Sequence, residues 1–161
     1  MILKGIIDND IVNYKKISMV LEFPICKNFK CDKECGKRVC QNSSLASAPN
    51  ICIPSISIID DYINNPLTQA IVMQGLEPFD SWDDLYHFIV DFRKYSDDDI
   101  VIYTGYTEEE IYHRKDIIDK LKQFKNIIIK FGRFIPNQSS HYDEVIGVNL
   151  ASPNQYGKRL T

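Results

Sequence analysis

Four cysteines follow one another in a short stretch of this chain, and they constrain its fold more than any other feature. Cys26, Cys31, Cys35 and Cys40 lie within fifteen residues, directly after an apolar run at 17–23. The N-terminus, MILKGIIDND, lacks the basic start and apolar run of a secretory signal, so we expect a reducing, cytoplasmic location. In such a compartment clustered thiols indicate metal ligands or redox groups, and disulfides are not expected.

The spacing of the cysteines leaves more than one kind of centre open. The intervals between them are four, three and four residues, whereas structural zinc usually takes paired cysteines with a second pair farther along the chain. One evenly spread run suits a loop wrapped around one face of an iron–sulfur cluster. If three of the four thiolates hold the cluster, one iron stays open to another ligand. The spacing therefore favours a cluster, with zinc or unligated thiols as the alternatives.

Length and charge set broader limits. With 161 residues, of which 44% are hydrophobic, the chain is expected to form a single domain over residues 1–161 with a sizeable core. The net charge of -3 argues against a nucleic-acid partner, and the absence of a run of about eighteen apolar residues argues against a membrane span. The cysteine loop is locally basic, with Lys27, Lys30, Lys33, Lys37 and Arg38 against Asp32 and Glu34. This charge indicates either a docking face for an acidic partner or a loop that its charges keep solvated.

Short apolar runs alternate with helical patterns along the chain. Strands are expected at 17–23, 69–73, 100–103, 126–131 and 144–149, entered from a polar lead at 8–16. Helices are expected at 57–64 with Ser57 as N-cap, after Ser81, and over 108–124 with Thr107 and Glu110 forming a capping box. This alternation predicts right-handed crossovers and an α/β fold, in which helices cover a mainly parallel sheet.

The predicted topology gives the cysteines and several later residues a common location. In open parallel sheets, ligands bind beyond the carboxyl ends of the strands. Cys26 follows the first strand, Gly75 the second, Thr104 and Gly105 the third, and Arg133 the fourth. We therefore expect these four loops to meet at one edge of the sheet.

Five segments of the chain also occur in a familiar order. They are IDNDIVNY at 7–14, the cysteine loop, MQGLEPF at 73–79, YTGYT at 103–107 and ASPNQ at 151–155. This order resembles that of the radical S-adenosylmethionine enzymes that activate the anaerobic (class III) ribonucleotide reductase, and the resemblance covers nearly the whole chain. It implies a minimal partial (βα) barrel of radical S-adenosylmethionine type.

The resemblance also implies a chemistry and two partners. In such enzymes three cysteinates hold a 4Fe-4S cluster, and the open iron chelates S-adenosylmethionine. One electron then cleaves this cofactor, and the resulting 5′-deoxyadenosyl radical generates a stored glycyl radical on the reductase. The implied partners are an anaerobic ribonucleoside-triphosphate reductase, which carries the glycyl radical, and a small electron-donor protein.

Two loops are implied to bind S-adenosylmethionine. Gly75, without a side chain, would let backbone carbonyls approach the methionine ammonium, or else it forms a simple turn. Pro78 would stiffen this loop, while Glu77 braces the loop, meets the ammonium or is solvated. Thr104 and Gly105 would contact the cofactor or form a turn before the next helix.

The chain departs from the family pattern at several positions. No three of its cysteines reproduce the usual Cys-x3-Cys-x2-Cys spacing, and Leu76 stands where a second glycine is usual. The third ligand is either Cys35, in a compact run, or Cys40, since Cys40-Gln41-Asn42 is similar to the family's Cys-aromatic-Asn ending. We expect Cys35, because short intervals hold thiolates at one face of a cube. The alternative function is a zinc-stabilised binding or regulatory module that kept the fold and lost the cofactor.

Other conspicuous residues have simpler interpretations. Cys52 is expected to be a small buried hydrophobe. The aspartates at 97–99 are expected to form a solvated turn before a strand. His87, His113 and His141 lie near no nucleophile or second ligand at a telling spacing, so surface or packing roles are expected for them.

Overall fold

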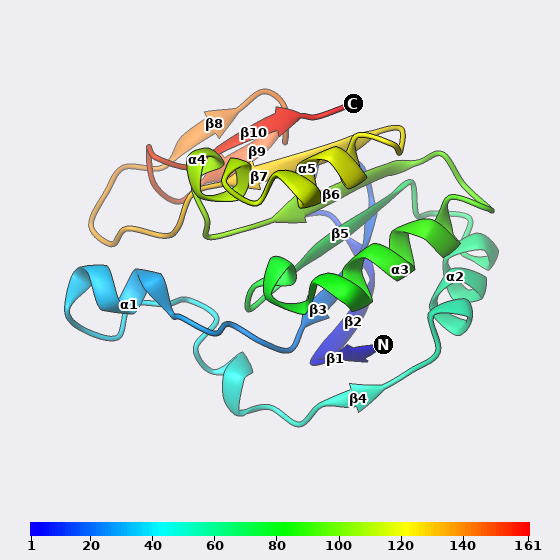
Figure 1. Cartoon of the computed structure of the whole chain (residues 1–161), viewed down its shortest axis with the longest axis horizontal. Helices are drawn as coiled ribbons and strands as arrows, with labels where there is room; N and C mark the ends of the chain where they lie inside the picture. The colour runs from blue at the N-terminus through cyan, green and yellow to red at the C-terminus, as the bar shows by residue number, and fades with distance from the viewer.

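The computed structural model describes the backbone of residues 1–161 and every side chain except that of Lys115. Its main sheet has six strands in the order β10-β7-β6-β5-β3-β2 (Figure 1). They are β2 (Gly5–Asp10), β3 (Ser18–Phe23), β5 (Ala70–Gly75), β6 (Asp99–Tyr103), β7 (Ile127–Phe131) and β10 (Tyr156–Arg159). The four central strands are parallel, and both edge strands, β2 and β10, are antiparallel to their neighbours. This confirms the predicted α/β class with a mainly parallel sheet.

The crossover helices all cover the same face of the sheet. They are α2 (Ser55–Asn64), α3 (Trp82–Phe92), α4 (Glu108–Tyr112) and α5 (Lys115–Leu121), and Figure 1 shows α3, α4 and α5 in front of the strands and α2 at the right-hand edge. Buried residues of all four helices belong to one core. Successive side chains of a strand point to opposite faces. Met19 and Leu21 of β3 therefore join the helices in the large core, whereas Val20 joins a smaller cluster on the other face. Because every crossover has the same hand, the parallel strands lie in sequence order.

Smaller elements complete the fold. Strand β1 (Ile2–Leu3) pairs with β4 (Ile51–Cys52), and β8 (His141–Asp143) pairs with β9 (Val148–Leu150). The cysteine loop contains the short helix α1 (Lys30–Cys35), and 3-10 turns occur at η1 (Leu45–Ser47) and η2 (Pro78–Ser81). None of the described helices is long and apolar enough to cross a membrane.

Two of the predicted helix starts need correction. Helix α2 begins at Ser55 with Pro54 at the N-cap position, so Ser57 lies inside the helix and caps nothing. The fixed φ of proline prepares the chain for this earlier start. Helix α3 does follow Ser81, but the Ser81 side chain makes no capping hydrogen bond, because the 3-10 turn η2 leads directly into the helix. The capping box of Thr107 and Glu110 is confirmed.

Several predicted boundaries were wrong for identifiable reasons. The helix expected over 108–124 is divided into α4 and α5. The strand expected at 144–149 is largely a turn, because the Asp143 carboxylate accepts hydrogen bonds from the backbone N–H groups of Val145 and Ile146. Only Val148–Leu150 is a strand there, and it pairs outside the main sheet. The edge of the main sheet is instead formed by β10, which the sequence did not predict, and β2 replaces part of the polar lead.

Two interpretations of single residues were also wrong. Cys52 is exposed, because it lies on the short strand β4 at the periphery of the fold. Asp99 is buried at the start of β6, where it accepts a hydrogen bond from the Tyr14 hydroxyl and pairs with Lys16 and Arg159. Burial is the largest single effect and by itself would raise the pKa of the Asp99 carboxyl. The three partners together outweigh it, so the pKa is lowered and the cost of burying the charge is offset.

Candidate functional site

A cavity of about 320 Å³ opens at the carboxyl edge of the parallel strands. Its lining includes residues from each loop that the sequence predicted to meet there, namely Cys26 after β3, Gly75 at the end of β5, Thr104 after β6 and Arg133 after β7. The predicted convergence is therefore confirmed. A cavity at this edge is the usual ligand site of an open parallel sheet.

Three of the four clustered thiols line the cavity. They are Cys26, Cys31 and Cys40, whereas Cys35, at the end of α1, lies outside the described lining. Burial and, to a smaller extent, the neighbouring Cys40 thiol raise the pKa of Cys31 to about 12. The Cys26 sulfur accepts a hydrogen bond of 3.3 Å from the backbone N–H of Phe29, and burial raises its pKa. The arrangement thus brings Cys40, rather than Cys35, to the other two thiols.

The Asp32 side chain explains how Cys31 and Cys40, which the segment 32–39 separates in sequence, come to line the same cavity. One oxygen of its carboxylate accepts hydrogen bonds of 2.7 Å from the backbone N–H groups of both Val39 and Cys40. These two donors are the main reason that the pKa of the Asp32 carboxyl is lowered. The segment 32–39 is therefore closed into a loop at its base, and Cys40 returns beside Cys31.

Gly75 joins the cysteine loop to the strand edge. Its carbonyl accepts a hydrogen bond of 2.7 Å from the side-chain amide of Asn42, two residues after Cys40. Its φ is +102°, and a Cβ here would lie 2.7 Å from the backbone nitrogen of Phe23. Only glycine fits both conditions, so the close approach that excludes a side chain is that of strand β3.

Leu76 fits its position without backbone strain. It is not among the residues with positive φ, and its N–H donates a hydrogen bond of 3.2 Å to the Phe23 carbonyl. Its side chain is half-buried and lines the cavity. The leucine therefore narrows the cavity and needs no shift of the backbone.

Glu77 braces two loops of the site. Its buried carboxylate accepts hydrogen bonds from the N–H of Phe79 (3.2 Å), the hydroxyl of Thr104 (2.8 Å) and the N–H of Gly105 (2.8 Å). The interpretation as a solvated carboxylate is therefore wrong. Burial raises the pKa of Glu77 to about 7, although the three donors act in the opposite direction. Pro78 is buried beside it, at the start of the turn η2.

Thr104 and Gly105 form the turn that receives this brace. The Thr104 hydroxyl also accepts a hydrogen bond of 3.0 Å from the N–H of Tyr106, which fixes the turn before α4. A Cβ on Gly105 would meet Arg133 and Glu77 only at 3.6 Å, which is ordinary contact. Both residues line the cavity. Neither the space around Gly105 nor its backbone conformation requires a glycine at this position, because its φ is not positive.

Two basic residues lie in the cavity wall, and one of them, Lys130, was not singled out from the sequence. Lys130 is buried, its ammonium donates a hydrogen bond of 2.8 Å to the Gly132 carbonyl, and burial lowers its pKa to about 7. Arg133 is 8% exposed and pairs through Nη2 with both oxygens of Glu110. Its buried Nε has no hydrogen-bond partner in the described structure. The sequence signal for Lys130 was a single lysine within the otherwise apolar strand NIIIKF.

The ASPNQ tail holds the loop that carries Arg133. The Asn154 side chain donates a hydrogen bond of 2.8 Å to the Arg133 carbonyl, and the Gln155 side chain donates one of 3.3 Å to the Gly132 carbonyl. Gly132 has a φ of +92°, and a Cβ there would lie 2.5 Å from the Asn154 carbonyl oxygen. The tail therefore supports the cavity wall from behind.

The thiols surround a cavity and do not converge on a point. Among the described side chains, no three of His, Cys, Asp and Glu lie close enough together to hold a single metal ion. A zinc ion needs its ligands around one centre, whereas a four-iron cube binds thiolates at separate corners. The donor set of Cys26, Cys31 and Cys40, spread along the lining of one cavity, fits an iron–sulfur cluster.

These features define an α/β protein with a thiol-lined cavity at the carboxyl edge of its parallel strands. The family model for the 4Fe-4S single cluster domain matches residues 26–149, a range that begins at Cys26 and includes the cysteine loop and the loops after β5, β6 and β7. The chain belongs to this family. No curated protein and no solved structure matches the chain. The predicted iron–sulfur cluster is thereby supported.

Proposed function

We propose that this protein is an iron–sulfur activase that reductively cleaves S-adenosylmethionine and generates a glycyl radical on an anaerobic ribonucleoside-triphosphate reductase. The observation that carries the proposal is that Cys26, Cys31 and Cys40 line the same cavity as the loops after β5 and β6. The bound cluster would supply the electron that breaks the sulfonium. The sequential strand order and the single layer of helices support a minimal partial barrel of radical S-adenosylmethionine type.

In this proposal Cys26, Cys31 and Cys40 hold the cluster, and one iron has no thiolate from the protein. The position of Cys31 and Cys40 in the lining of one cavity supports this set, as does the hydrogen bond from Asn42 to Gly75. Single serine replacements followed by anaerobic reconstitution and iron counting test it. We expect cluster loss in Cys26→Ser, Cys31→Ser and Cys40→Ser, and retention in Cys35→Ser. Retention in Cys40→Ser with loss in Cys35→Ser would transfer the third position to Cys35.

The remaining cavity residues suit the amino-acid end of S-adenosylmethionine. Arg133 offers a buried Nε donor without a partner in the described structure, and the Lys130 amine adds a second hydrogen-bond donor, so this wall favours a carboxylate. Glu77 positions the loops on either side through its three accepted hydrogen bonds. Leu76 borders the same space and would exclude water from the reacting group.

The activity is tested with reconstituted, anaerobic protein and dithionite. Methionine and 5′-deoxyadenosine should appear in equal amounts, and the cognate reductase should then show a glycyl radical by electron paramagnetic resonance. Intact S-adenosylmethionine after prolonged incubation of protein with a proven cluster would refute the cleavage. A radical on another protein would change the substrate but not the chemistry. Colourless protein with one bound zinc would favour the alternative, a zinc-stabilised binding module.

A further inference from the structure

Helix α1 is not explained by packing in the core. None of the described residues of Lys30–Cys35 is buried, and Figure 1 shows the helix standing out beyond the carboxyl edge of the sheet. The segment 32–39, which contains most of this helix, lies between Cys31 and Cys40 and has two of the proposed cluster ligands as its neighbours. Because α1 contributes no buried residue to the core, we expect a role of this segment at the protein surface.

The acidic and basic side chains of this segment differ in their surroundings. Both of its acidic groups have partners, since Asp32 accepts the backbone N–H groups of Val39 and Cys40, and the exposed Glu34 lies 3.4 Å from Nη1 of the buried Arg133. Its basic side chains are exposed, as is that of the neighbouring Lys27. Because the segment 32–39 is inserted between Cys31 and Cys40, we call these four residues the insertion face: Lys27, Lys33, Lys37 and Arg38. The face is therefore positive on a protein whose net charge is -3.

The insertion face is also held in place. Lys30 forms an ion pair with Glu110 and lies 4.8 Å from the centre of the Tyr106 ring, so the start of α1 is anchored to α4. Arg133 joins Glu34 and Glu110 at the same place. A surface that is already ordered loses little conformational entropy when a partner binds.

We propose that the insertion face docks a small, acidic electron-donor protein. The inference rests on the proposed function, because the docked protein would deliver the electron that the cluster needs. One electron leaves the donor's reduced flavin or iron–sulfur group and enters the cluster, which passes from its 2+ to its 1+ state, and no bond forms or breaks. Since Cys31 and Cys40 flank the insertion, a donor seated on it lies beside the cluster.

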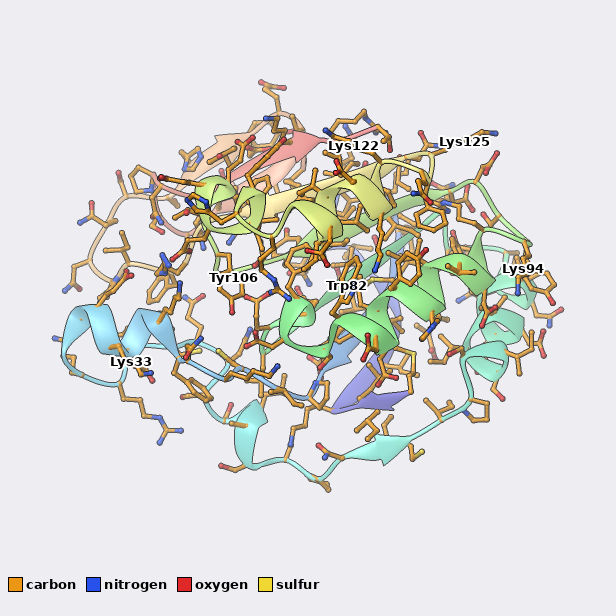
Figure 2. The ribbon with its side chains drawn as sticks, viewed as in Figure 1. Lys33, Trp82, Lys94, Tyr106, Lys122 and Lys125 are labelled. Atoms are coloured by element: carbon orange, nitrogen blue, oxygen red, sulfur yellow. The ribbon has the colours of Figure 1, made fainter. Side chains whose placement is uncertain are left out.

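The test uses cluster-loaded protein and reduced flavodoxin, an acidic flavoprotein, in anaerobic stopped-flow mixing without S-adenosylmethionine. The triple variant Lys33→Glu, Lys37→Glu, Arg38→Glu reverses the insertion face. The matched control, Lys94→Glu, Lys122→Glu, Lys125→Glu, makes the same change in net charge at the opposite end of the molecule (Figure 2). We expect the second-order rate of cluster bleaching at low salt to fall at least about tenfold in the first variant, and less than about twofold in the control.

Two further measurements keep the outcome decisive. Wild-type reduction by flavodoxin should slow as salt rises, and binding of oxidised flavodoxin, followed by calorimetry, should weaken in the reversed variant but not in the control. Equal effects in both variants, or salt-independent reduction of the wild type, would overturn the docking site. If the reversed variant does not load its cluster, the calorimetric comparison and the wild-type salt series still decide. Competition by duplex DNA would assign the face to nucleic acid.

The two proposals can fail separately. Reduction and binding are measured without S-adenosylmethionine or the reductase, so they do not depend on cleavage. Cleavage driven by dithionite does not need the insertion face, and should therefore survive in the reversed variant.

Discussion

Glu77 should make the stability of this protein fall as pH rises through neutrality. Its pKa is about 7 in the folded protein, against about 4.5 for an ordinary glutamate, because burial disfavours the charged form. Between these two values the folded state holds a proton that the unfolded state has released, so stability decreases with pH in that window and levels off above it. A difference of roughly 2.5 pKa units, at about 1.4 kcal/mol per unit, corresponds to about 3 kcal/mol.

The measurement is urea unfolding of wild type and Glu77→Gln from pH 4.5 to 7.5, with reduced, cluster-free protein. Glutamine keeps the shape but cannot ionise, so the stability difference between the two proteins should change by about 3 kcal/mol across this range. Lys130 has a lowered pKa of about 7 and acts in the opposite direction, but mainly above this range. Parallel stability curves for the two proteins would show that the Glu77 pKa is not raised, and the reasoning would be refuted.

Three other perturbations test the site. Gly75→Ala should lower the free energy of unfolding by roughly 3 kcal/mol, or the melting temperature by about 10 °C, because of the positive φ and the clash with Phe23. The control Gly105→Ala should change the free energy of unfolding by less than about 0.5 kcal/mol, and equal melting points of the two variants would contradict the reasoning. Asp32→Ala should lower the iron bound after reconstitution, and Asp32→Asn should restore it, since the amide oxygen still accepts both N–H groups. Leu76→Gly should keep or tighten binding of S-adenosylmethionine, measured by equilibrium dialysis, and a large loss would show that the leucine contributes to the site.

The central strands could be predicted because they are buried on both faces. A short apolar run such as that at 127–131, in a chain with helical patterns on either side, predicts a strand buried on both faces. Each central strand lies within two residues of its expected position. The edge strands β2 and β10 escaped prediction for the opposite reason. Their side chains are mostly exposed or half-buried, so they show no clear alternation, and pairing with a neighbour defines them.

The site could be predicted in its location but not in its connections. Parallel topology alone brings the loops after β3, β5, β6 and β7 to one edge. That Glu77 spans two of these loops, and that Arg133 reaches Glu110, depends on rotamers and on packing that no spacing in the sequence expresses. The same holds for Asp99, whose three partners come from distant segments and turn an apparently solvated aspartate into a buried one.

The cysteines show most clearly where spacing fails as a measure of distance. Cys35 is closer to Cys31 in sequence than Cys40 is, but α1 carries it away from the cavity. Asp32 then closes the segment behind it, so that Cys40 lines the cavity together with Cys31. Closing a few more residues costs little entropy, so two charge-assisted hydrogen bonds are enough to offset it. An interrupted motif can thus keep its geometry, and the interrupting residues are then free to carry charges that serve another purpose.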